Sequence, residues 1–131
     1  MAITREKKEA LIQEYVDLLS DSEAVVFVRS RGLTVAEVTD LRNNIREAGG
    51  TYTVVKNTLF RLALDRVDLP VPELITGPLA VTFCPEDLAP SVKVVSDFAK
   101  ELDEREFGIV GGILDREVLD AERAAALASL P

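Results

Sequence analysis

Helical and strand-like patterns alternate along the whole chain, and this alternation limits the fold more than any other feature. Apolar residues at helical spacing run from the capping residue Thr4 to about Ser20, and the unbroken apolar run Ala24–Val28 follows. A run that is apolar at successive positions is typical of a strand covered on both faces. Further strands are predicted at 51–55, 79–83 and 106–114, with helices at 34–48, from 56 to about 67, after Pro90, and over 121–130. The order αβαβαβαβα predicts an α/β fold, a single domain with a central four-stranded sheet, all parallel or mixed, flanked by helices.

The start of the second predicted helix is the best defined boundary. Thr34 and Glu37 have the spacing of a capping box, in which each side chain bonds the backbone N–H of the other residue. Gly49 and Gly50 end this helix, as glycine often does at a helix C-terminus. The residues expected to face the core are Val35, Val38, Leu41, Ile45 and Ala48.

Composition excludes several classes of function. The chain has 131 residues, enough for one domain, and it lacks both a secretion signal and an apolar stretch approaching the roughly 20 residues that span a bilayer. A cytoplasmic protein without membrane contact is therefore expected. The chain has no histidine, and its one cysteine, Cys84, lies in an apolar run where a small buried side chain is expected. Without the commonest general base and metal ligand, no enzyme activity, metal or cofactor is predicted.

Charge is distributed unevenly. The net charge is −8, yet residues 1–66 carry ten basic and ten acidic side chains, whereas residues 67–131 carry five basic and thirteen acidic ones. Residues 29–61 have a net charge of +3. Screening confines each charge to about 10 Å, so a local basic surface can bind phosphate while the rest of the molecule is acidic. The alternative is a mixed, solvated surface, and charge alone does not decide between the two.

The basic residues of this segment lie where predicted elements begin and end. Arg29 and Arg31 lie just before Gly32 at the end of the first strand, and Arg42 and Arg46 are four residues apart, on one face of the second helix. The second predicted strand ends at Lys56. If the first two strands are neighbours, their C-terminal ends bring Arg29, Arg31 and Lys56 to one edge of the sheet.

The third helix begins directly after Lys56. Asn57 or Thr58 is expected to cap it, and the free N–H groups of its first turn could receive a phosphate. Arg61 follows one turn later. Arginine forks together with backbone amides suit the recognition of folded RNA by its phosphates and shape. Ordinary surface residues around well-capped helices remain the alternative at this point.

Several of these motifs, in this order and spacing, resemble the large-subunit ribosomal protein L-ten family. The matching stretches are Ser30-Arg31-Gly32-Leu33-Thr34-Val35, Leu41-Arg42 with Arg46-Glu47-Ala48-Gly49, Val54-Val55-Lys56-Asn57-Thr58-Leu59, Gly77-Pro78, Phe98-Ala99-Lys100, Gly111-Gly112 and Ala128-Ser129-Leu130-Pro131. The likeness covers essentially the whole chain.

The resemblance implies that residues 1–131 form a domain that binds large-subunit ribosomal RNA at the stalk base, near ribosomal protein L-eleven. Family members continue into a C-terminal helix that carries dimers of the acidic stalk protein, which recruit translational GTPases. That helix is expected to be absent from residues 1–131, so these residues should not hold stalk dimers themselves. The residues predicted to contact RNA are Arg5, Lys7, Lys8, Arg29, Arg31, Gly32, Arg42, Arg46, Lys56, Asn57, Thr58 and Arg61.

Two alternatives stay open. A ribosome-assembly factor that shares this domain would occupy the same RNA site temporarily, and it would be found in precursor particles only. An acidic protein-interaction module formed by residues 67–131 would retain its partners after nuclease treatment.

Overall fold

The computed structural model describes residues 4–30, 33–77, 79–102 and 107–129. Helices and strands alternate over most of this length, as the sequence predicts. The elements are α1 (Arg5–Ser20), β1 (Ala24–Ser30), α2 (Val35–Glu47), β2 (Thr51–Val54), α3 (Asn57–Arg66), β3 (Leu79–Cys84), α4 (Ala89–Glu101), β4 (Phe107–Leu114), β5 (Glu117–Asp120), α5 (Ala121–Ala126) and a short 3-10 turn (Leu127–Ser129).

The sheet has five strands in the order β2-β3-β1-β4-β5, and each neighbouring pair is antiparallel. One α/β domain is confirmed. The expectation of a parallel or mixed sheet is wrong, because every neighbouring pair is antiparallel. The predicted count of four strands is also wrong because β5 was missed. This strand is only four residues long, and a two-residue turn at Asp115 and Arg116 joins it to β4. Both turn residues have positive φ, 51° and 66°. Such turns usually contain glycine, so the usual sequence signal of a hairpin is missing here.

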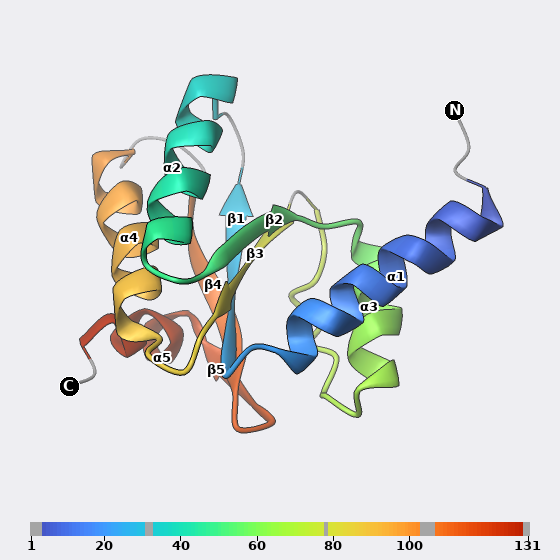
Figure 1. The fold of residues 1–131 in the computed structure, drawn as a ribbon. Coiled ribbons are helices and arrows are strands. Elements are labelled where there is room, and N and C mark those ends of the chain that lie inside the picture. The colour runs from blue at the N-terminus through green and yellow to red at the C-terminus, as the bar shows by residue number, and fades with distance from the viewer. Residues whose placement is uncertain (1–3, 31–32, 78, 103–106, 130–131) are drawn as a thin grey trace.

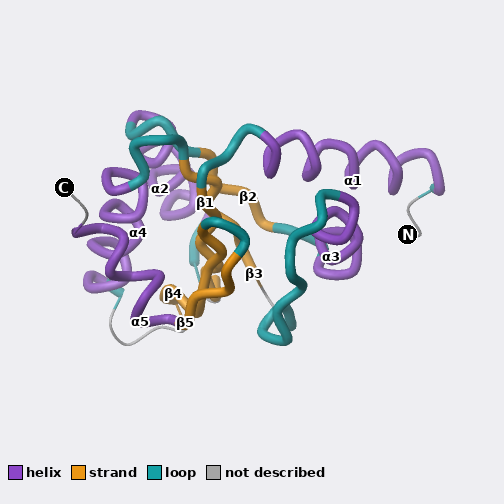
Figure 2. The backbone as a smooth tube through the Cα atoms, turned by 90° about the horizontal axis from the view of Figure 1, so that it is seen from below, coloured by secondary structure: helices purple, strands orange, loops and turns teal. Residues whose placement is uncertain are grey.

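Helices cover both faces of the sheet. Figures 1 and 2 show α1 and α3 on one side and α2, α4 and α5 on the other. Alternate residues of β1 enter the two cores: Val25 and Phe27 pack with α1 and α3, whereas Val26 and Val28 pack with the helices of the other layer. This confirms the prediction of a first strand covered on both faces.

The predicted capping box opens α2. The Glu37 backbone N–H donates to Thr34 Oγ1 at 3.1 Å, and the Thr34 N–H donates to Glu37 Oε1 at 2.9 Å. Leu41 and Ile45 are fully buried, as expected. The prediction that Val35 faces the core is wrong, since this side chain is 85% exposed. It lies in the first turn of α2, which extends past the end of β1 in Figure 1, so no sheet residue is there to cover it.

The capping box leads to a stability prediction. Replacing Thr34 with alanine removes the acceptor for the Glu37 N–H and is expected to lower the free energy of unfolding by about 1 kcal/mol. Thr34→Ser keeps the hydroxyl and should change it by only a few tenths. Urea melts of both variants test this, and equal losses for serine and alanine would show that the hydroxyl does not stabilise the helix.

Two glycines of β4 allow close contact at the centre of the sheet. A Cβ atom on Gly112 would lie 2.7 Å from the Val25 carbonyl oxygen. A Cβ on Gly111 would lie 2.6 Å from Leu74 Cδ2 and 2.9 Å from the Leu119 carbonyl oxygen. These glycines therefore let β4 approach its neighbours on both sides.

Candidate nucleic-acid interface

Arg29 and Lys56 lie at the same end of the sheet, although the assumption that β1 and β2 are neighbours is wrong. Strand β3 lies between them and is antiparallel to both. Arg29 is opposite Leu79 on one side of β3, and the Val55 N–H donates to the Leu79 carbonyl oxygen at 3.2 Å on the other. The C-terminal ends of β1 and β2 therefore flank the first residue of β3, with Arg29 as the next-to-last residue of β1 and Lys56 two residues after β2.

The loop before β3 contributes a third segment to this end of the sheet. Gly77 has φ of 68°, in the left-handed region that favours glycine. A Cβ on Gly77 would lie 3.4 Å from Nη1 of Arg29, so the guanidinium rests beside this turn. The Asn57 Nδ2 donates to the Gly77 carbonyl oxygen at 2.8 Å from the other side. Sequence reasoning treated Gly77 only as part of a turn and missed its place among the basic residues.

The expected capping of α3 by Asn57 or Thr58 is wrong. Lys56 occupies the N-cap position and makes no side-chain capping bond. The Asn57 Nδ2 donates to the Gly77 carbonyl oxygen, and its buried Oδ1 accepts no hydrogen bond within the described residues. Thr58 is exposed in the first turn. That turn therefore starts without a side-chain cap, directly after Lys56.

Arg61 also bonds the loop before β3. Its Nη2 donates to the Ile75 carbonyl oxygen, two residues before Gly77. Arg61 and Asn57, both predicted to contact RNA, thus hold the loop in the free protein. Their observed role is to position Gly77 and, through it, the surroundings of Arg29.

This role predicts a loss of stability when Arg61 is truncated. Arg61→Ala leaves the Ile75 carbonyl without its donor, which should cost about 1–3 kcal/mol of unfolding free energy. Arg66→Ala, in the same helix, breaks an exposed ion pair with Glu9 and should cost less than about 1 kcal/mol. Denaturant unfolding of the two variants compares them directly, and a larger loss for Arg66→Ala would contradict the bracing role of Arg61.

Arg42 and Arg46 form a second basic group along the edge of β2. They lie one turn apart on α2 and, with Gly50 to Thr53, line a hollow of about 230 Å³. Both arginines are exposed, and within the described ranges neither guanidinium has an ion-pair or hydrogen-bond partner. The prediction that they lie on one flank of the helix is confirmed.

Tyr52 connects the two basic groups. Its hydroxyl donates to Ser30 Oγ at 3.1 Å, which links β2 to the residue that follows Arg29. Burial raises the pKa of Tyr52, while the Ser30 bond and the nearby charge of Arg42 oppose that shift. The phenol therefore stays neutral at physiological pH and holds its bond. We define the basic surface as Arg29, Arg42, Arg46 and Lys56.

The remaining predicted contacts lie elsewhere. Arg5, Lys7 and Lys8 are exposed on the first turns of α1, on the side of the sheet opposite α2. The structure does not bring them to Arg42 and Arg46. The predicted contacts Arg31 and Gly32 lie outside the described residues.

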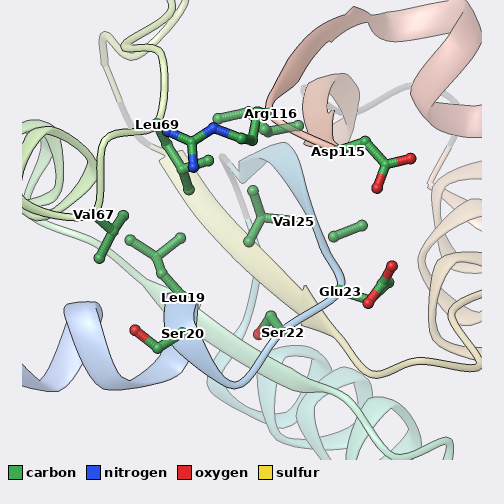
Figure 3. Close-up of a pocket in the computed structure, with 11 residues that line it drawn as sticks. Leu19, Ser20, Ser22, Glu23, Val25, Val67, Leu69, Asp115 and Arg116 are labelled. Carbon is green, nitrogen blue, oxygen red and sulfur yellow. The ribbon is translucent and has the colours of Figure 1, made fainter.

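Two other hollows have the wrong charge for RNA. One, of about 570 Å³ between α2 and α4, carries the carboxylates of Asp40, Glu47, Asp97 and Glu101. The other, of about 430 Å³, lies at the opposite end of the sheet, where β1 begins and β4 ends; its lining residues are shown in Figure 3.

The hollow of Figure 3 contains one basic residue, Arg116, whose Nη2 donates to the Asp68 carbonyl oxygen at 2.5 Å. Glu23 and Asp115 supply carboxylates. Cations free to meet phosphate are therefore found at the basic surface and not in this hollow.

The described residues provide no metal site, no membrane-spanning helix and no reactive cysteine. They contain no group of three residues able to hold a metal ion, and none of their helices combines the length and apolar character needed to cross a membrane. Cys84 is fully buried, and burial raises the pKa of its thiol to about 11. The thiol therefore stays protonated at neutral pH and packs in the core, as the sequence predicted.

Comparison with known proteins identifies the family. Residues 3–100 match the family model described as Ribosomal protein L10. The chain is 42% identical, over 132 aligned positions, to proteins named large ribosomal subunit protein uL10 from Staphylococcus aureus strains JH9, Newman and JH1. The alignments cover 100% of this chain and 78% of each relative. A match over most of the chain at this identity shows that the protein belongs to the ribosomal protein L10 family.

Proposed function

We propose that residues 1–131 form a domain that binds large-subunit ribosomal RNA at the stalk base, as a structural component of the ribosome. The observation that carries this proposal is the gathering, at one end of the sheet and along β2, of cations that have no ion-pair partner among the described residues, in a chain of net charge −8. Family membership supports it. The predicted ribosomal, cytoplasmic location agrees with that membership, and the family is one of ribosomal proteins rather than enzymes.

Each part of the basic surface has a distinct role in this proposal. Arg29 and Lys56 meet phosphates at the end of the sheet, where the turn at Gly77 lets the RNA backbone come close to the protein backbone. The N–H groups in the first turn of α3 add a partial positive charge beside Lys56. Arg42 and Arg46 extend the contact along β2. The Arg31–Gly32 segment, which joins β1 to α2, is proposed to contribute as well.

The acidic surfaces face away from RNA in this arrangement. The carboxylates between α2 and α4 would repel phosphates and so restrict the orientations in which the domain can bind. Ribosomal protein L-eleven is proposed as a neighbour at the stalk base. Stalk dimers are proposed to be held by a C-terminal helix outside residues 1–131, so this domain alone should bind RNA without them.

Filter binding tests the proposed function. The chain should bind a large-subunit RNA fragment containing the stalk base more tightly, by about 1,000-fold or more, than a folded control RNA of equal length at the same salt concentration. Equal affinity for both RNAs would show that the chain binds RNA only by non-specific electrostatic attraction, and it would contradict the proposed function. The assembly-factor alternative predicts the protein in precursor subunits only, whereas a structural component is also present in mature subunits.

A further inference from the structure

We propose that the hollow between Arg42, Arg46 and β2 seats one phosphate group of the RNA backbone and recognises it by arginine forks and an open strand edge. This inference rests on the proposed function and adds a defined phosphate position to it. The expected ligand is the sugar–phosphate backbone of an RNA strand that passes along the outer edge of β2.

The ladder between β2 and β3 determines which backbone groups face this hollow. Thr51, Tyr52, Thr53 and Val54 are opposite Phe83, Thr82, Val81 and Ala80. The Val55 N–H donates to its opposite residue, Leu79, so Val55 belongs to a hydrogen-bonded pair. Such pairs alternate along an antiparallel ladder. Thr53 and Thr51 therefore bond to β3, whereas the N–H groups of Tyr52 and Val54 point away from it, toward the open edge.

The turn between α2 and β2 brings the arginines to this edge. Gly49 has φ of 90°, and the Gly50 N–H donates to the Ile45 carbonyl oxygen at 2.9 Å. A Cβ on Gly50 would lie 3.0 Å from both the Phe83 carbonyl oxygen and Ser91 Cβ. Only a residue without a side chain fits there unless these neighbours shift. The last turns of α2 are consequently fixed against the start of β2.

The charges in the hollow favour an anion. Arg42 and Arg46 are separated by one helical turn, so both guanidinium groups can reach one tetrahedral group from the same side. Within the described part of the chain, no carboxylate or other acceptor occupies either guanidinium. Tyr52, whose N–H points toward the open edge, is one of the residues that line the hollow.

Arginine is needed at these positions if the phosphate is recognised by shape. A guanidinium donates two parallel hydrogen bonds in a fixed plane, whereas a lysine ammonium acts as a point charge. The double substitution Arg42→Lys/Arg46→Lys retains both charges and removes both forks. It therefore separates recognition of a seated phosphate from general electrostatic attraction.

The first experiment uses inorganic phosphate and the free 131-residue chain. In an NMR titration at constant ionic strength, the amide signals of Gly50 to Thr53 should shift with added phosphate. Acetate should shift them less, and the lysine double variant should require at least about ten times more phosphate. Shifts spread evenly over all exposed basic residues, or stronger shifts with acetate, would overturn the phosphate seat.

The second experiment measures binding of the stalk-base RNA. The lysine double variant should bind about tenfold more weakly or worse, with nearly the same dependence on salt, because its charge is unchanged. The matched control Arg66→Lys/Arg123→Lys changes two exposed arginines outside the basic surface and should bind like the parent chain.

The outcomes separate the two proposals. If the parent chain binds the RNA specifically and the lysine double variant binds equally well, the phosphate seat is wrong and the proposed function stands. If the parent chain does not bind the RNA, both are wrong. Thermal melts of all variants show whether any loss of binding comes from unfolding.

Discussion

Replacing Arg29 and Lys56 together with alanine is expected to weaken binding of the stalk-base RNA by about 100-fold or more, since each charge-assisted contact contributes about 1.5–3 kcal/mol. Both side chains lie at the end of the sheet and hold no intramolecular ion pair within the described ranges. The double variant should therefore stay folded. Each lost phosphate contact should also reduce the slope of log affinity against log salt by about 0.7–0.9, or about 1.4–1.8 for two contacts.

The control for this experiment is Arg66→Ala/Arg123→Ala, which removes the same charge from exposed positions outside the basic surface. It should lower affinity only slightly, through the change in net charge, and leave the slope almost unchanged. If the Arg29/Lys56 variant remains folded and binds with the slope of the parent chain, the end of the sheet does not contact phosphate.

Phe60→Ala is expected to cause the largest loss of stability, about 3–5 kcal/mol. Phe60 belongs to α3, and its side chain is fully buried in the core between the sheet and the helices α1 and α3. Its ring makes edge-on contacts with Tyr15, Phe27 and Phe83, at centroid distances of 5.7, 6.1 and 6.3 Å. Truncation opens a cavity where α1, α3, β1 and β3 meet. For a domain of this size such a loss is a large part of the total stability.

Leu62→Ala is the matched control for Phe60, two residues away in the same helix. Leu62 is 47% exposed, so its truncation should change the unfolding free energy by less than about 1 kcal/mol. Chemical denaturation monitored by circular dichroism compares the two variants. A loss below about 2 kcal/mol for Phe60→Ala would mean that this core is not held by the aromatic cluster.

Local sequence patterns predicted the elements that depend on local contacts. Thr34 and Glu37 bond within four residues of each other, so their spacing alone indicates the helix start. The apolar run of β1 indicated burial on both faces, and its alternate residues do enter two cores. The flank position of Arg42 and Arg46 likewise follows from helical spacing.

The features that were missed depend on contacts between segments far apart in the chain. Nothing near Arg61 in the sequence indicates that its guanidinium bonds the carbonyl of Ile75, so it was counted as a free cation. Asn57 was expected to cap its own helix, but its amide bonds Gly77, twenty residues away. The strand order was not predicted for the same reason. Strand β3 lies between β1 and β2, which both precede it in the chain.

Hydrogen exchange of the RNA complex tests the central claim most directly. The outward N–H groups of Tyr52 and Val54 are free of the β-ladder, so RNA at the basic surface should slow their exchange, together with the amides of Thr76 and Gly77. The turn at Asp115 and Arg116, at the other end of the sheet, should exchange at the same rate with and without RNA. Protection of that turn or of the acidic face of α4, with no change along β2, would contradict this account.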